Sequence, residues 1–192
     1  FATRATAGGM ATKLPDGTIA YSTGLTYGLT RMLSGLVFST ALILIVISGA
    51  ELFTGNNLIV MAFIRGKVSL GQLVRNWTIV YLGNFIGSIL TAGIMLLTRQ
   101  YTFGNGIVGY NALTIAVAKS EFGFVQAIAL GILCNALVCL AVWMTFSART
   151  TADKILAIIP PITAFVTAGF EHSIANMYYM PIALFIKQLD PA

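Results

Sequence analysis

The chain has 192 residues, of which 57% are hydrophobic and 9% are charged, and its mean hydropathy is +0.87. Soluble domains carry about 25% charged residues, so this composition excludes an ordinary soluble protein and predicts an integral membrane protein lying in a lipid bilayer. The net charge of +5 does not indicate nucleic-acid binding, because the Lys and Arg residues stand singly at the ends of apolar runs and form no basic patch in the sequence.

The first segments of the chain are expected to lie outside the membrane core. Residues 1–7 are interpreted as the tail of a preceding helix, and residues 8–27 as an exposed loop with a turn at Pro15-Asp16-Gly17. Apolar runs without charge follow at 32–50, 76–98 and 122–148, each near the ~20 residues that cross a bilayer. We expect three spans, with 32–50 opening a discontinuous helix over 32–64 and the runs 76–98 and 122–148 forming two unbroken helices before a second discontinuous helix over 155–186. A second exposed loop is expected at 101–109.

Three shorter apolar segments, 52–64, 155–170 and 173–186, are expected to be half-helices. The breaks beside them, at 49–54 and 169–173, both contain the pattern Gly-x-Glu. Irregular backbone in hydrocarbon is tolerated only where it is buried in protein or lines a cavity. The matching breaks therefore predict one shared site at mid-membrane. Counting crossings inverts the second broken helix relative to the first, which is an inverted repeat.

The basic residues give a small bias in orientation. One loop carries Arg65, Lys67 and Arg75 without an acid, and another carries Arg149 and Lys154 beside an aspartate. The positive-inside rule places both loops in the cytoplasm.

Two hydroxyl residues, Thr54 and Ser173, are expected to open the second halves of the broken helices as N-caps. Free amides and positive dipole ends would then face mid-membrane and favour a small anion. The alternative, that both residues only cap their helices, remains open.

The breaks also carry the ionisable residues. His172 is the only histidine, and an ionisable group at bilayer depth is more often on a substrate or proton path than a packing residue. Glu51 and Glu171 are expected to accept hydrogen bonds from the backbone amides freed by their own breaks, a structural support role. Paired carboxylates also serve as acid and base in hydrolysis, although no other catalytic group accompanies these two.

Metal and cofactor sites are not predicted. Cys134 and Cys139 lie within one apolar run and have no partners at ligand spacing, so they are interpreted as packing residues.

Taken together, several stretches resemble the formate/nitrite transporter family: 49–56, Asn76-Trp77 with 81–84, 131–144 and 169–177. The resemblance extends from about residue 31 to residue 187. It implies a homopentamer of aquaporin-like protomers, each with its own pore and six helices, and both termini in the cytoplasm. Residues 1–192 would then form a single transmembrane domain, incomplete at both ends, holding the end of helix one through helix five.

The resemblance also implies the pore residues. His172 would be the central pore histidine and Thr54 would lie on the loop of the first broken helix, with Asn176 and Lys119 as polar residues near the pore. Two hydrophobic constrictions would lie on either side of the histidine, formed by Leu42, Leu52 and Phe53 and by Phe165 and Phe170.

The function expected from these residues is transport of small monovalent weak-acid anions through an inner-membrane pore. Formate is the first candidate, and nitrite, acetate and lactate follow. Lys119 would attract the anion, and His172 would share or donate a proton so that a neutral acid crosses the constriction. One alternative is an aquaporin-type pore for a neutral solute, whose paired Asn-Pro-Ala signatures are missing. The other is a membrane hydrolase using Glu51 and Glu171.

Overall fold

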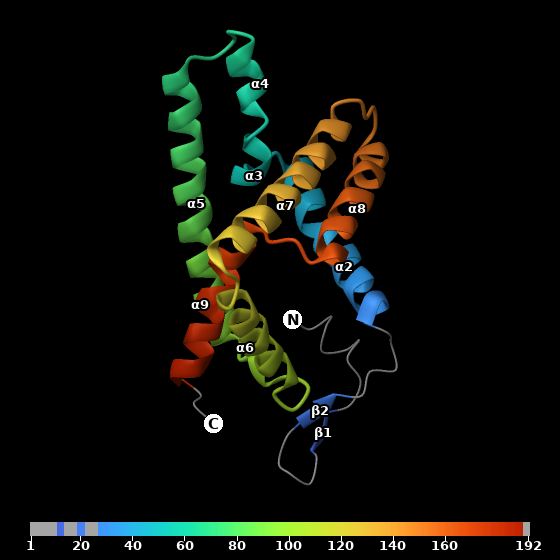
Figure 1. Ribbon diagram of the computed structural model, residues 1–192, viewed down its shortest axis with the longest axis vertical. Coiled ribbons are helices and arrows are strands. Elements are labelled where there is room, and N and C mark those ends of the chain that lie inside the picture. The colour runs from blue at the N-terminus through green and yellow to red at the C-terminus, as the bar shows by residue number, and fades with distance from the viewer. Residues whose placement is uncertain (1–10, 14–18, 22–26, 190–192) are drawn as a thin grey trace.

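A computed structural model describes residues 11–13, 19–21 and 27–189 of the chain (Figure 1). The expected helix tail at 1–7 and the turn at 15–17 lie outside the described residues. In chain order the elements are β1 (Ala11–Lys13), β2 (Ile19–Tyr21), α2 (Tyr27–Ser48), α3 (Phe53–Asn56), α4 (Ile59–Ile64), α5 (Leu70–Leu97), the 3-10 helix η1 (Gln100–Thr102), α6 (Ile107–Ser120), α7 (Phe124–Thr145), α8 (Thr151–Ala168) and α9 (Ser173–Leu189).

Apart from one small hairpin, the described elements are helices. The hairpin pairs β1 with β2 in antiparallel register, with Ala11 opposite Tyr21, within the segment expected to be a loop. Helices α2, α5, α7 and α8 are long and apolar enough to cross a membrane. Helix α5 has 28 residues, which at 1.5 Å per residue gives about 42 Å, more than the ~30 Å of a hydrocarbon core. The predicted all-α integral membrane fold is confirmed.

Both predicted breaks are present. Helix α2 ends at Ser48 and α3 begins at Phe53, while α8 ends at Ala168 and α9 begins at Ser173. Glycines at 49 and 169 have φ angles of +72° and +82°, the left-handed conformation that ends helices and that a side chain disfavours. The half-helix expected at 52–64 is further divided into α3 and α4.

The two broken helices run in opposite directions along the long axis. In Figure 1, α2 rises to the middle of the molecule and α4 continues to the top, whereas α8 descends to the middle and α9 continues to the bottom. Helices α2 and α8 approach closely at Gly35, where an added Cβ would lie 2.8 Å from the Thr163 carbonyl oxygen. The inverted repeat is therefore confirmed, with its first halves packed together.

The main core forms where α2 and α8 meet α7. Its buried residues are Leu42, Cys134, Val138, Ala141, Ile158, Ile162 and Phe165. Both cysteines are free, as their interpretation as packing residues requires, and Cys134 lies inside this core. The core fixes the inner end of the first half of each broken helix.

Helix α6 was not predicted. It begins after Gly106, whose φ is +81°, and packs through Ala112 against Ala92 of α5 and Ile182 and Ile186 of α9. With 14 residues it is too short to span a bilayer. The loop expected at 101–109 overlaps only its first three residues, and no element was predicted for 110–120. Its last turn carries Lys119.

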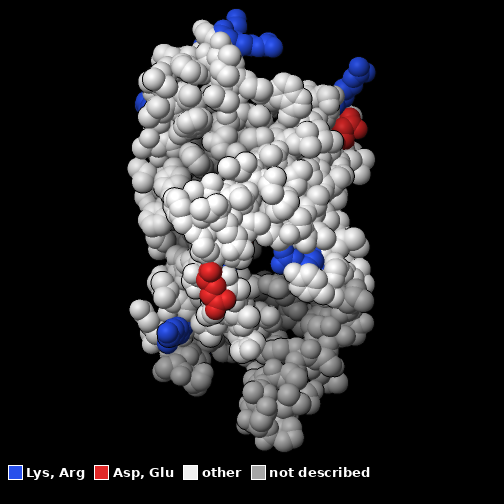
Figure 2. Space-filling view, viewed as in Figure 1, with Lys and Arg blue, Asp and Glu red and all other residues white. Residues whose placement is uncertain are grey.

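The α4–α5 and α7–α8 connections lie at the same end of the molecule (Figure 1). Figure 2 shows Lys and Arg side chains at this end. Both basic loops therefore face one side of the membrane, and their cytoplasmic placement stays a prediction.

Candidate functional site

The two breaks meet at a contact between Thr54 and His172. The Thr54 Oγ1 atom lies 3.3 Å from His172 Nε2, although the residues are 118 positions apart. Thr54 is 4% exposed and His172 is 7% exposed. The chain thus brings one hydroxyl and its only imidazole together in a buried place, where the sequence predicts the shared site.

The hydrogen bonds of His172 determine how its ring is used. The backbone N–H of Ala175 donates to Nδ1 over 3.1 Å, so Nδ1 acts as an acceptor. A neutral imidazole has one N–H, which is therefore on Nε2 and is directed at the Thr54 hydroxyl.

The capping predictions for Thr54 and Ser173 are wrong. His172, not Ser173, supplies the side-chain acceptor at the start of α9, and Ser173 is the first helical residue. Thr54 is the second residue of α3, whose N-cap, Leu52, makes no side-chain hydrogen bond. Because α3 has four residues, it is too short for an appreciable dipole, and only α9 presents a helix start of useful length to the site.

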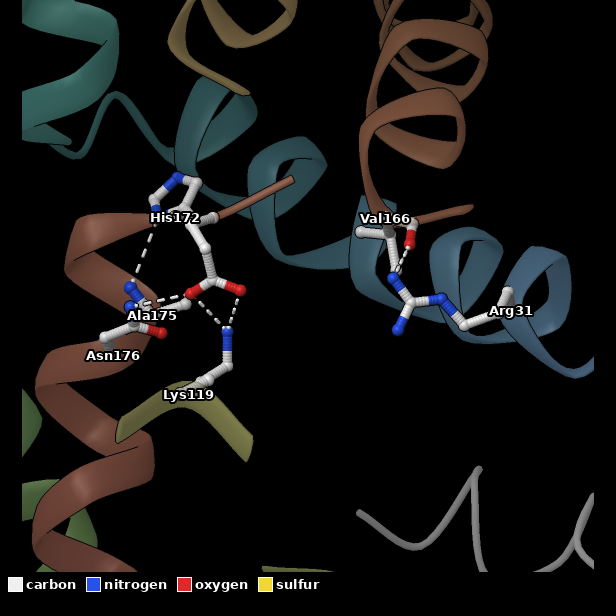
Figure 3. A network of polar contacts seen from close by, with 7 residues as sticks. Arg31, Lys119, Val166, His172, Ala175 and Asn176 are labelled. Carbon is white, nitrogen blue, oxygen red and sulfur yellow. Dashed lines mark hydrogen bonds and ion pairs between the residues drawn. The ribbon is translucent and has the colours of Figure 1, made fainter. Parts of the chain in front are cut away.

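Beside His172 lies a charged cluster of side chains from α6, the second break and α9 (Figure 3). Lys119 Nζ lies 2.7 and 2.6 Å from the Glu171 Oε1 and Oε2 atoms, and Asn176 Nδ2 donates to Oε2 over 3.0 Å. The Lys119 and Glu171 side chains are 15% and 11% exposed. Glu171 was expected to bind freed backbone amides, but its carboxylate binds side chains, because α6 and α9 bring these donors within reach.

The first break has a cluster of its own. Glu51 Oε2 accepts hydrogen bonds from Asn56 Nδ2 over 2.8 Å and from Asn76 Nδ2 over 3.2 Å. The freed backbone groups are bound instead by Asn84 of α5, whose Oδ1 accepts from the Phe53 N–H over 3.0 Å and whose Nδ2 donates to the Glu51 carbonyl over 3.2 Å. Glu51 was also expected to bind freed amides, and Asn84 takes that role.

Three cavities follow one another past these clusters. We call them the vestibule, of about 510 Å³, the inner cavity, of about 240 Å³, and the upper cavity, of about 410 Å³. The inner cavity shares wall residues with each of the other two. Phe38, Phe165 and His172 line both the vestibule and the inner cavity. Leu42 and Leu52 line both the inner and the upper cavity. Figure 2 shows a hollow on the drawn face with basic side-chain atoms at its rim.

The shared walls locate the apolar narrowings. The Phe38 and Phe165 rings meet edge to face with centroids 5.5 Å apart, and each lies within about 6 Å of the His172 ring (6.1 and 5.8 Å). Phe38 is one of the large apolar residues of the broken helices that the sequence offers for a constriction, although the resemblance does not imply it. Its spacing of four from Leu42 puts both on one helix face, and this signal was available in the sequence.

The other predicted constriction residues are placed differently. Phe53 stacks edge to face on Tyr81, with centroids 5.2 Å apart. With Ser173 it lines a fourth hollow, of about 540 Å³, whose walls also include Thr54 and His172. Phe170 lines the vestibule and packs against the main core. Among the residues that the structure describes, no three His, Cys, Asp or Glu side chains are grouped as metal ligands.

A family model described as formate/nitrite transporter matches residues 2–191. The chain belongs to the formate/nitrite transporter family. Its resemblance to that family in sequence is thus confirmed, and the chain is a multi-pass membrane protein of a transporter family.

Individual members of the formate/nitrite transporter family are also similar to it. The chain is 43% identical over 163 residues to formate channel FocA of Haemophilus influenzae, a match covering 85% of this chain and 57% of that protein. It is 44% identical over 161 residues to formate channel FocA of Escherichia coli K12, covering 84% of this chain and 56% of that protein. It spans little more than half the length of these relatives.

A solved pentameric formate channel with formate bound has a similar structure. The TM-score is 0.82 at 53% sequence identity, over 88% of this chain and 66% of that one. The shared fold therefore extends over nearly all the helices described above.

Proposed function

We propose that the protein carries small monovalent weak-acid anions, formate first, across the inner membrane through a pore in each protomer. Nitrite, acetate and lactate are further candidates. The observation that carries the proposal is the position of His172, which is buried at the meeting of the breaks and lines both the vestibule and the inner cavity. Similarity to formate channels supports formate as the first substrate.

The walls of the path explain why a proton is needed. Beyond His172 the inner cavity is lined mainly by apolar side chains, with Leu42 and Leu52 at its far side. Moving a bare carboxylate into such surroundings costs several kcal/mol, whereas a neutral acid avoids most of this cost. An anion that gains a proton at His172 can therefore cross the apolar section as the acid.

His172 and Thr54 provide the donors at that point. The Nε2 proton now directed at Thr54 Oγ1 is directed at the anion when one arrives. For transfer, a hydronium ion in the vestibule gives a proton to Nδ1 and becomes water as the Ala175 N–H is released. The Nε2 proton then passes to the anion, which leaves His172 neutral with its proton on Nδ1. The Thr54 hydroxyl then donates a hydrogen bond to the unprotonated Nε2 atom.

The assembly we propose is a homopentamer with the basic α4–α5 and α7–α8 connections in the cytoplasm. The similar solved channel is pentameric. Large apolar side chains of α5 are exposed in the single chain, including Leu82, Leu90 and Ile94, at 51%, 62% and 63%. Such a face is suited to lipid or to a neighbouring protomer. A mass measurement in mild detergent should give a pentamer, and a monomer would contradict this assignment.

Uptake into proteoliposomes tests the function. We expect formate, nitrite and lactate to enter, with formate uptake rising as the external pH falls and accumulating against its gradient when a proton gradient is imposed. Glycerol is the neutral control. Entry of glycerol without entry of any anion would favour the aquaporin-type alternative and overturn the proposal.

A further inference from the structure

The vestibule receives two cationic side chains from opposite sides. Arg31 reaches it from α2 and Lys119 from α6 (Figure 3). Lys119 contacts both oxygens of Glu171, at 2.6 and 2.7 Å. Its positive charge is therefore largely compensated by a carboxylate on the same wall.

Arg31 is not compensated in this way. Within residues 27–189, the ion pair present is the one between Lys119 and Glu171. The Arg31 Nη2 atom donates to the Val166 carbonyl over 2.7 Å, and the guanidinium carbon lies 5.9 Å from the centre of the Tyr27 ring. Arg31 Nε is buried and has no hydrogen-bond partner. The guanidinium is thus held in place by a neutral carbonyl, and among the described residues its charge is not paired with a carboxylate.

We propose that Arg31, not Lys119, is the residue that recruits anions into the vestibule and favours planar two-oxygen anions over spherical ones. This inference rests on the proposed function. A guanidinium carries its donors in a planar fork that matches a carboxylate, whereas a lysine ammonium acts as a point charge. One uncompensated charge in a cavity with low-dielectric walls raises the local concentration of counter-ions by at least about tenfold.

The position of Arg31 suits a recruiting role. It lines the same cavity as Phe38, Phe165 and His172. The bond to Val166 places it at the end of α8, immediately before the second break. An anion drawn to Arg31 is therefore inside the cavity whose walls include the aromatic narrowing and His172.

The test measures formate influx into proteoliposomes over a range of formate concentrations at low and high ionic strength. Arg31→Gln should raise the half-saturating concentration about tenfold at low salt and remove most of its salt dependence. Arg31→Lys should keep the salt dependence but lose discrimination between formate and chloride. An unchanged half-saturating concentration in Arg31→Gln would overturn the proposal.

A second variant separates charge from structural support. Gln126 is an exposed residue of α7 that lines the same vestibule. Adding Gln126→Lys to Arg31→Gln restores the vestibule charge but not the bond to Val166. We expect the double variant to return the half-saturating concentration to within about threefold of the parent value. Failure to restore it, with the pentamer intact, would mean that Arg31 acts only by supporting α8.

Binding measured without transport distinguishes this proposal from the proposed function. Titration of the detergent-solubilised protein with carbon-13 formate, followed by NMR line broadening, should detect binding that Arg31→Gln weakens about tenfold. If the parent protein binds formate in this way but carries none, the proposed function fails and Arg31 keeps its role. If both proteins bind formate equally, the role of Arg31 is refuted while transport is judged by the uptake assay.

Discussion

The two breaks are built on one pattern but use it differently. Each has a left-handed glycine, a glutamate two residues later, and an asparagine five residues after the glutamate. The Asn56 amide donates to Glu51 over 2.8 Å, and the Asn176 amide donates to Glu171 over 3.0 Å. In both breaks the carboxylate therefore links the irregular backbone, through a hydrogen bond, to the helix that follows, α3 in the first break and α9 in the second.

The remaining partners separate the breaks. Glu51 is bonded to the neutral Asn76, whereas Glu171 is bonded to the charged Lys119. The residue after the glutamate is Leu52 in the first break and His172 in the second. One repeat unit thus contributes an apolar wall and the other contributes the titratable group. The repeat supplies the geometry, and its departures from symmetry supply the proposed chemistry.

The largest difference between the two breaks should appear in transport, when His172 is replaced. His172→Asn keeps a polar side chain but removes the titratable ring, so formate uptake driven by a proton gradient should fall at least about 100-fold. Leu52→Asn, at the corresponding position of the first break, should change the size of the flux but leave its pH dependence. Pentamer mass controls for assembly. Wild-type uphill uptake by His172→Asn would show that the proton role belongs elsewhere.

The two glutamates should differ in stability. Glu171→Gln leaves the ammonium of Lys119 largely buried without its carboxylate and should lower the free energy of unfolding by about 3 kcal/mol. Glu51→Gln should cost about 1 kcal/mol, because the amide oxygen still accepts from neutral donors. Denaturant titration of both variants in the same detergent measures the difference. Equal losses would mean that Lys119 is not held by Glu171 in the protein.

The existence and positions of the breaks are predictable because ionisable residues are rare within membrane-spanning apolar runs. An ionisable side chain inside an apolar run is costly in hydrocarbon, and so is irregular backbone. Glu51, Glu171 and His172 therefore mark the candidate site from sequence alone. The inversion of the repeat follows from counting crossings.

The partners of these residues were not predictable in the same way. Lys119 lies 52 positions from Glu171, and Asn84 lies 31 from Phe53, and no periodic pattern relates such distant residues. The preference of Thr54 for His172 over a capping role is likewise a tertiary contact that overrides a local propensity. Helix α6 was missed because its length is unsuited to a span, although it supplies Lys119. A polar residue within an apolar run, such as Asn84, predicts that its side chain has a hydrogen-bond partner, but the sequence does not identify that partner.

Asn84 gives the next contrast. At the first break it binds one backbone N–H and one carbonyl group, so Asn84→Leu should lower the free energy of unfolding by about 2 kcal/mol. The second break instead uses the longer backbone bond from Glu171 N–H to Leu130 O, at 3.4 Å. Thr78→Val is the matched control on α5, because its hydroxyl binds only its own helix. Losses of the same size in the two variants would contradict a special role for Asn84.

The smallest contrast concerns the two glycines, which have nearly the same φ angle but different surroundings. An added Cβ at Gly49 meets nothing within 4 Å, so Gly49→Ala should cost only the strain of the left-handed backbone, about 1 kcal/mol. An added Cβ at Gly169 lies 2.9 Å from the Arg31 Nη2 atom, so Gly169→Ala should also displace the guanidinium from Val166 and cost about 2 kcal/mol in total. Denaturant titration gives both values, and formate titration adds an independent readout.

Gly169→Ala should weaken formate binding and Gly49→Ala should not, because only an added side chain at Gly169 would contact Arg31, the residue that we propose recruits the anion. A Gly169→Ala protein with the stability of Gly49→Ala and unchanged formate binding would show that Arg31 moves aside without consequence.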